Sequence, residues 1–251
     1  MNIKWDAAGY TNNFSYVHEY GNDVIGLLSL NLGQSVLDLG CGNGALTKKL
    51  IDIGLSAIGL DASEELLEIA KKNYPDIHFM LGDATNFALE KQVDAVFSNA
   101  VLHWIDQDKQ SDMLRCVHSA LKPGGQFVFE LGGKGNNDLI HQTLHDEFKH
   151  RGYVYKMQYY FPSIGAYSSL LEEHGFSVSY AVLFDRATPL NGKNGLSDYI
   201  YMFIKTPFEG MTEKEKADMV QEAVTQLKPN LYKDGIWYSD YVRLRMKAQK
   251  I

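Results

Sequence analysis

The feature that most constrains the fold is a glycine-rich turn between a short apolar segment and an amphipathic one. Residues 35–39 have the length and composition of a buried strand, and glycines follow at positions 40, 42 and 44. Apolar residues then recur at helical spacing over 45–53. Glycine permits positive φ and a close backbone approach, and a helix N-terminus offers free N–H groups. The pattern predicts a strand–turn–helix unit, which either binds a ligand or is only a tight turn.

Strands and helices alternate through the first half of the chain. Further strands are expected at 56–60, 78–81, 93–98 and 126–131, and helices at 63–73 and 107–121. This alternation predicts an α/β fold with a mostly parallel sheet between two layers of helices. In such sheets ligands bind beyond the carboxyl ends of the strands. The residues that directly follow the strands are therefore the candidate site.

The second half is less regular. Strands are expected at 176–184 and 236–246, and helices at 135–151, 168–174, 195–205 and 212–228, the last capped by Thr212 and stopped by Pro229. We expect one domain with four parts: an N-terminal helical lid (1–30), a cofactor-binding core (31–131), substrate and lid insertions (132–235) and the last strand (236–251).

Composition excludes several classes of function. The net charge is −7, with no basic run of the kind that binds nucleic acid, so a small-molecule partner is favoured. No apolar run approaches the length of a membrane span, and the first residues do not resemble a signal segment. Two distant cysteines, Cys41 and Cys116, suit a reducing compartment and indicate neither disulfide nor metal site. We expect a cytoplasmic monomer or homodimer.

The spacing of the glycines narrows the choice of ligand. A dinucleotide fingerprint has the spacing GxGxxG, whereas this turn reads GxGxG, and no Walker lysine follows. Asp61 ends the second strand, where a carboxylate can accept from both ribose hydroxyls, and Asp83 follows the third, where it or the Ala84 N–H can meet an adenine edge. Each acid by itself is equally compatible with a helix cap or a solvated turn.

With these motifs in order, the chain resembles class I S-adenosylmethionine-dependent methyltransferases of the type 11 group. The resemblance rests on five segments within residues 35–131: VLDLGCGNG, IGLDAS, GDA, VDAVFSNAVLHW and LKPGGQFVFE. The resemblance implies a Rossmann-like sheet of seven strands, the last antiparallel, and S-adenosylmethionine as cofactor. It implies that the glycine loop holds the methionine part, Asp61 the ribose and Asp83 with Ala84 the adenine. The implied cofactor-binding residues are Tyr10, Gly40, Cys41, Gly42, Asn43, Asp61, Ala62, Asp83, Ala84, Asn99 and Ala100.

Outside the motifs the chain is similar to the branch that contains trans-aconitate methyltransferase. The similar features are Trp5-Asp6 with Tyr10, the run from Ser98 to Trp104, and Tyr160-Phe161-Pro162-Ser163. The chain departs from that branch where an acidic–arginine pair is expected, since residues 14–20 read FSYVHEY. The resemblance therefore supports methyl-transfer chemistry more strongly than trans-aconitate as the acceptor.

Two residues are the candidate catalytic side chains. His103 follows a strand end and is expected either to face the acceptor, as base or hydrogen-bond donor, or to cap the next helix. Arg186, placed directly after the sixth strand, is expected to hold an anionic acceptor. Arg243 and Arg245 share one face of the last strand, where structural pairing is expected. Aromatic clusters near residues 153–161 and 199–203 either line an acceptor pocket or pack in the core.

The functional hypothesis is methyl transfer to a small molecule, with a carboxylate as the leading acceptor. A carboxylate has a pKa near 4, is ionised at neutral pH and needs no base, whereas a hydroxyl acceptor usually needs one. Two alternatives remain: a domain that binds the cofactor without catalysis, and a nicotinamide-dependent oxidoreductase.

Overall fold

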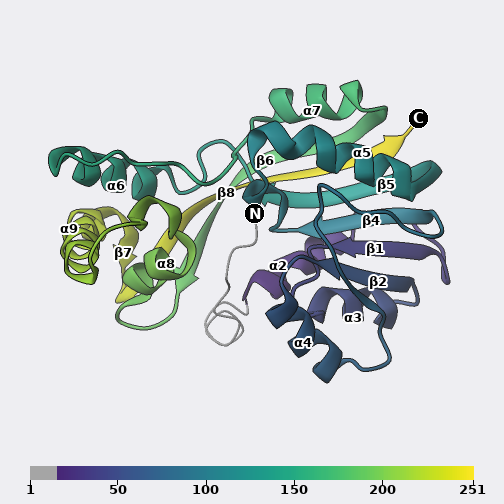
Figure 1. The fold of residues 1–251 in the computed structure, drawn as a ribbon, viewed down its shortest axis with the longest axis horizontal. Coiled ribbons are helices and arrows are strands. Elements are labelled where there is room, and N and C mark those ends of the chain that lie inside the picture. Colours follow the sequence, from purple (N-terminus) through teal and green to yellow (C-terminus); the bar gives the residue numbers. More distant parts are fainter. Residues whose placement is uncertain (1–15) are drawn as a thin grey trace.

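The computed structural model of the chain describes residues 16–251, which form a mixed α/β structure (Figure 1). The strands are β1 (Ser35–Leu39), β2 (Ser56–Asp61), β3 (Phe79–Leu81), β4 (Val93–Asn99), β5 (Leu121–Gly132), β6 (Phe176–Leu190), β7 (Tyr232–Lys233) and β8 (Ile236–Lys250). The α-helices are α2 (Tyr16–Ile25), α3 (Ala45–Asp52), α4 (Glu64–Asn73), α5 (Gln110–Ala120), α6 (Asp138–His150), α7 (Ile164–Glu173), α8 (Gly195–Phe203) and α9 (Glu213–Leu231). Short 3-10 turns lie at Leu102–Trp104, Gln107–Lys109 and Thr206–Phe208. Within the described residues, the longest helices are too short or too polar to cross a bilayer.

All eight strands belong to one sheet with the order β3-β2-β1-β4-β5-β8-β6, and the short β7 pairs with β8 beside this path. The pairs from β3 to β5 are parallel, whereas β8 runs antiparallel to both of its long neighbours, β5 and β6. The structure therefore confirms the predicted Rossmann-like sheet with an antiparallel last strand, and adds the two-residue β7.

Helices cover both faces of the sheet (Figure 1). Successive side chains of a strand point to opposite faces. Val36, Ala95 and Val128 pack in one cluster with α2 and α3, while Leu37 and Phe127 pack in another with α5 and α7. Burial on both faces explains why the central strands are continuous apolar runs rather than alternating ones.

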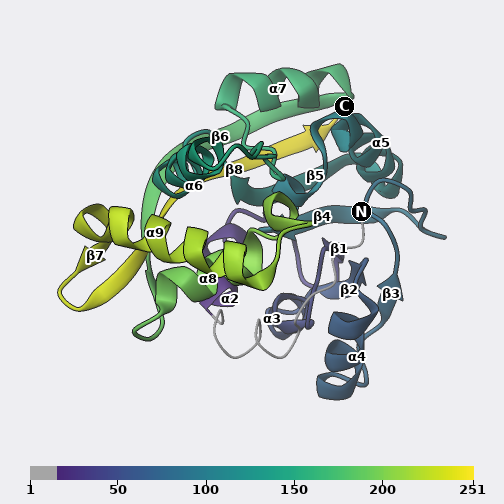
Figure 2. The ribbon, with the colours of Figure 1, turned by 60° about the vertical axis from the view of Figure 1, so that its left-hand side comes forward.

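The long strands β6 and β8 extend past the core of the sheet and carry a second group of elements. Figure 1 and Figure 2 show α6, α8, α9 and β7 gathered around the far ends of these two strands. We call this group the cap. It has a hydrophobic cluster of its own, in which Trp237 and Tyr241 of β8 pack with Leu144, Ile200 and Met219 of the three helices. The same two strands thus link the parallel core to the cap.

Several predicted boundaries were wrong, and the largest difference concerns β6. This strand continues to Leu190 because it pairs with β8 along its whole length, so Arg186 lies inside the strand rather than after it. Helix α9 runs through Pro229 to Leu231, whose buried side chain packs in the cap cluster. The prediction that Thr212 is the N-terminal capping residue of α9 is confirmed, since its hydroxyl accepts from the backbone N–H of Glu215.

Candidate active site

The glycine turn after β1 has the conformation that its sequence predicts. Gly40 and Gly44 have φ of 79° and 80°, in the left-handed region that disfavours other residues. A Cβ on Gly40 would lie 2.2 Å from Val101, and one on Gly44 would lie 2.6 Å from Phe79. The backbone N–H of Gly40 donates to the carbonyl of Leu60 at 2.7 Å. The turn is therefore tied to the end of β2 and cannot accept side chains at either glycine without shifting its neighbours.

Asp61, at the end of β2, holds the glycine turn from the other side. Its Oδ2 accepts from the backbone N–H of Gly42, and its Oδ1 from that of Ser63, each at 2.8 Å. Burial raises the pKa of Asp61, against these hydrogen bonds. A Cβ on Gly42 would meet only Leu66, at 4.0 Å, so this part of the turn is open to a ligand. The open backbone beside an anchored carboxylate fits the cradle that a nucleoside cofactor needs.

A cavity of about 390 Å³ lies beyond the carboxyl ends of β1, β2 and β4. Ten of the predicted site residues line it: Gly40, Cys41, Gly42, Asp61, Ala62, Asp83, Ala84, Asn99, Ala100 and His103. Two do not, since Asn43 is buried outside the lining and Arg186 lies elsewhere on the sheet. Tyr10, predicted to bind the cofactor, lies outside the described residues.

His103 is buried at the middle of this cavity. The backbone N–H of Gly132 donates to its Nδ1 at 3.2 Å. Because an N–H can only donate, Nδ1 carries the lone pair, and the neutral ring has its proton on Nε2. Burial, together with the positive charge of Arg243, holds the pKa of His103 well below its usual value. In this tautomer Nε2 can donate and Nδ1 is already occupied, which favours the predicted role as hydrogen-bond donor over the predicted role as base.

Beyond His103 the cavity is walled by aromatic rings, and we call this part the aromatic end. Neighbouring ring centroids lie 4.7 Å apart for Trp104 and Tyr159, 5.2 Å for Tyr159 and Phe161, and 4.8 Å for Tyr199 and Phe203. The residues of the aromatic end are His103, Trp104, Asn136, Asn137, Tyr159, Phe161, Tyr199, Phe203, Tyr241 and Arg243. They come from the segment after β4, the segments on both sides of α6, helix α8 and β8.

Two tyrosine hydroxyls of the aromatic end are already occupied. Tyr159 donates to the carbonyl of Phe203 at 2.6 Å, and Tyr199 accepts from Nδ2 of Asn137 at 2.7 Å. Burial raises the pKa of Tyr159 well above its usual value. The rings consequently present mainly apolar surface to the cavity, and Tyr159 is not suited to act as a base.

Arg243 brings a positive charge to the aromatic end. Its guanidinium lies over the ring of Tyr241, 4.0 Å from the centroid, and the side chain is 6% exposed. Among the described residues, no carboxylate lies within ion-pair distance of Arg243, and its buried Nε has no hydrogen-bond partner. The expectation of structural pairing was therefore wrong for this arginine, which lines the cavity instead.

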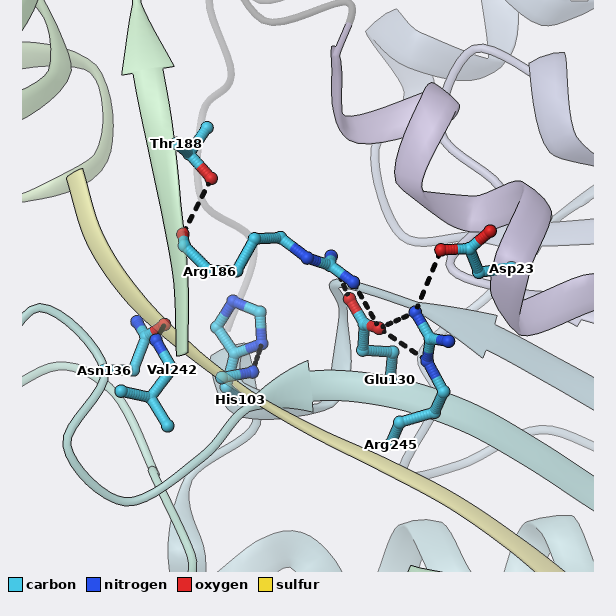
Figure 3. A network of polar contacts seen from close by, with 9 residues as sticks. Asp23, His103, Glu130, Asn136, Arg186, Thr188, Val242 and Arg245 are labelled. Atoms are coloured by element: carbon cyan, nitrogen blue, oxygen red, sulfur yellow. Dashed lines mark hydrogen bonds and ion pairs between the residues drawn. The ribbon is translucent and has the colours of Figure 1, made fainter. Parts of the chain in front are cut away.

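Arg186 makes the structural pair that was expected of Arg243. Two of its nitrogens donate to the carboxylate of Glu130 at 2.6 and 3.1 Å, and Nε of Arg245 donates to the same carboxylate at 2.9 Å. Figure 3 shows Glu130 between the two arginines, with Asp23 of α2 on the outer side of Arg245. Arg186 thus lies within β6 rather than after it, pairs with Glu130 and is not among the residues that line the cavity, which argues against its predicted role in holding the acceptor.

The sequence reading missed Asn136, Asn137 and the cavity position of Arg243. The two asparagines lie shortly after β5, which ends at Gly132, so they belong to a segment that the topological rule marks as ligand-binding but whose members were not named individually. The aromatic clusters were identified, but not which members reach the cavity. Among the described residues, no group of His, Cys, Asp and Glu side chains is arranged to hold a metal ion.

The sequence matches a known family over the region of the glycine turn. Residues 36–125 match the family model described as a methyltransferase domain. An uncharacterised methyltransferase of Schizosaccharomyces pombe is 29% identical over 98% of both chains. The malonyl-[acyl-carrier protein] O-methyltransferase of Halalkalibacterium halodurans is 33% identical over 46% of this chain and 44% of its own length.

The fold is also similar to solved structures. An S-adenosylmethionine-dependent methyltransferase from Mesorhizobium loti superposes with a TM-score of 0.56 at 20% identity, covering 93% of this chain and 98% of the other. At this identity the likeness establishes the fold. The matched domain, the relatives and the fold together support a class I S-adenosylmethionine-dependent methyltransferase, with S-adenosylmethionine as its cofactor.

Proposed function

We propose that this protein transfers a methyl group to a carboxylate oxygen of a small organic acid bound at the aromatic end. The observation that carries the proposal is Arg243, a buried cation at the cavity wall without a carboxylate partner among the described residues. A guanidinium recognises a carboxylate through paired donors. An anionic acceptor would supply the counter-charge that this side chain lacks.

The residues of the glycine turn would hold the cofactor. When bound, S-adenosylmethionine supplies the methyl group as an electrophilic sulfonium substituent. Asp61 keeps acceptor capacity beyond its two backbone hydrogen bonds, which suits ribose hydroxyls, and Asp83 with Ala84 would meet the adenine. Asn99 and Ala100, at the end of β4, would border the methionine part.

The absence of a base at the aromatic end favours a carboxylate over a hydroxyl acceptor. Among its residues that the structure describes, the aromatic end has no carboxylate. Its histidine, His103, has Nδ1 occupied and its proton on Nε2. A carboxylate oxygen forms its bond to the methyl carbon while the carbon–sulfur bond breaks and sulfur keeps the electron pair. No proton moves, so alignment and exclusion of water suffice, and alignment can lower a barrier by roughly 7–11 kcal/mol.

The relative that acts as a malonyl-[acyl-carrier protein] O-methyltransferase also supports transfer to oxygen. Its similarity covers less than half of either chain, so the support concerns the chemistry and not the acceptor itself.

The test is a screen with S-adenosylmethionine labelled in the methyl group against carboxylic acids, phenols and amines. We expect label in base-labile methyl esters of acids. Transfer confined to phenols or amines would overturn the proposal. Binding of S-adenosylhomocysteine without transfer to any acceptor would favour a cofactor-binding protein without catalysis.

A further inference from the structure

Three residues of the aromatic end, His103, Asn136 and Arg243, lie around Gly132, a residue without a side chain at the end of β5. We call these three residues the acceptor cradle. Gly132 pairs with Arg243 across the sheet and donates its N–H to His103. A Cβ on Gly132 would lie 2.5 Å from the ring of Phe161 and 3.2 Å from Cγ of Asn136. Phe161 and Asn136 therefore fill the space that glycine leaves, while His103 and Arg243 neighbour its backbone.

Three of these neighbours, which all line the cavity, carry a hydrogen-bond donor. His103 carries its proton on Nε2, and within residues 16–251 the Nε–H of Arg243 has no hydrogen-bond partner. Oδ1 of Asn136 accepts from the backbone N–H of Val242 at 3.1 Å, which assigns Nδ2 as the group available to the cavity.

The rest of the aromatic end offers apolar surface. Rings of Trp104, Tyr159, Phe161 and Phe203 wall it, and the hydroxyl of Tyr159 is bound to a backbone carbonyl. Among the described residues that line the whole cavity, the cations are Arg243 and Lys109; Lys109 lies 3.6 Å from the carboxylate of Asp112, and Arg243 is the charged side chain of the aromatic end. A second or third carboxylate of an acceptor would thus be buried against rings without a partner, at a large desolvation cost.

Resting on the proposed function, we infer that the acceptor is a monocarboxylate with an apolar body. The carboxylate is held by Arg243, His103 and Asn136, and the body packs against the rings. Tricarboxylates and other polycarboxylates are excluded because the cradle neutralises one negative charge.

Binding and turnover are measured separately to test this inference. Calorimetry of the protein saturated with S-adenosylhomocysteine compares octanoate and phenylacetate with trans-aconitate and citrate. We expect the apolar monocarboxylates to bind at least tenfold more tightly. Arg243→Gln should weaken their binding roughly 10- to 100-fold, the loss expected of a charged hydrogen-bonded contact. Arg115→Gln, at an exposed position of α5, is the matched control and should leave binding unchanged.

Unchanged affinity of Arg243→Gln for S-adenosylhomocysteine shows that the variant is folded, and Arg243→Lys, which keeps the charge, should recover part of the binding. Equal or tighter binding of trans-aconitate or citrate overturns the inference, as does binding of the monocarboxylates that is insensitive to Arg243→Gln. Ester formation in the same reactions with S-adenosylmethionine reports on the proposed function. Selective binding of monocarboxylates without ester formation would refute the proposed function and support the cradle. Formation of polycarboxylate esters would support the proposed function and refute the cradle.

Discussion

The backbone N–H of Gly132 donates to Nδ1 of His103 across 3.2 Å, and this contact decides what the imidazole can do. With Nδ1 occupied, the proton of the neutral ring sits on Nε2, toward the cavity. Burial and the charge of Arg243 keep the pKa of His103 well below its usual value, so the ring stays neutral at physiological pH. We therefore expect the ring to orient an anionic acceptor rather than to take a proton from one.

If His103 only orients the acceptor, the dependence of kcat on pH should show no inflection from a histidine. Between pH 6 and pH 8, kcat for an acid acceptor should not change through titration of His103, because the ring is already deprotonated across that range. His103→Asn should raise the acceptor KM about tenfold, through loss of a hydrogen bond to a charged group. The exposed His150→Asn is the control. A wild-type kcat that rises through an apparent pKa near 6.5, and loses that rise in His103→Asn, would show that His103 acts as a base.

Substitution of Arg186, or of the Glu130 that pairs with Arg186 and Arg245, should affect stability rather than acceptor binding. Glu130→Gln leaves Arg186 and Arg245 buried without their shared counter-ion and should reduce the free energy of unfolding by about 3–5 kcal/mol. Arg186→Gln should also destabilise the protein, yet leave the acceptor KM of the folded fraction unchanged, since Arg186 does not line the cavity. Denaturant unfolding and steady-state kinetics measure the two effects. An Arg186→Gln variant of normal stability with a raised KM would restore Arg186 to the acceptor site.

Asp61 should matter to the cofactor rather than to the acceptor. Asp61→Ala removes the carboxylate that holds the N–H groups of Gly42 and Ser63 and that is proposed to bind the ribose. Binding of S-adenosylhomocysteine should weaken by about 1–3 kcal/mol, measured by calorimetry. Asp52→Ala, at an exposed position of α3, should have no effect. Unchanged affinity of Asp61→Ala would refute the ribose role.

Asp38 predicts a pH dependence of stability. Burial raises its pKa from 3.8 to about 7, against the hydrogen bond from Thr47 and with the nearby charge of Asp61. A carboxyl group that keeps its proton in the folded state and loses it in the unfolded state makes stability fall as pH rises. The free energy of unfolding should therefore decrease between about pH 4 and pH 7, by up to about 4 kcal/mol for this one group.

The variant Asp38→Asn keeps the oxygen that accepts from Thr47 but cannot titrate. Its unfolding free energy, measured by urea denaturation at several pH values, should lack most of this decrease. A slope equal to that of the wild type would mean that Asp38 is ionised in the folded protein.

The sequence by itself determined the end of the cavity at which we propose that the cofactor binds. Gly40, Asp61 and Asn99 are local signals, since each lies at the end of an apolar strand, and parallel strands bring such ends to one edge. Their order along the chain therefore specified the sheet and the edge where the cavity lies.

Only the tertiary structure decided the acceptor end. Arg186 and Arg243 have the same chemistry, and each lies within a long strand. Which one reaches the cavity depends on the register of β6 against β8 and on Glu130, which captures Arg186. Such pairings join residues more than fifty positions apart, so local periodicity carries no record of them.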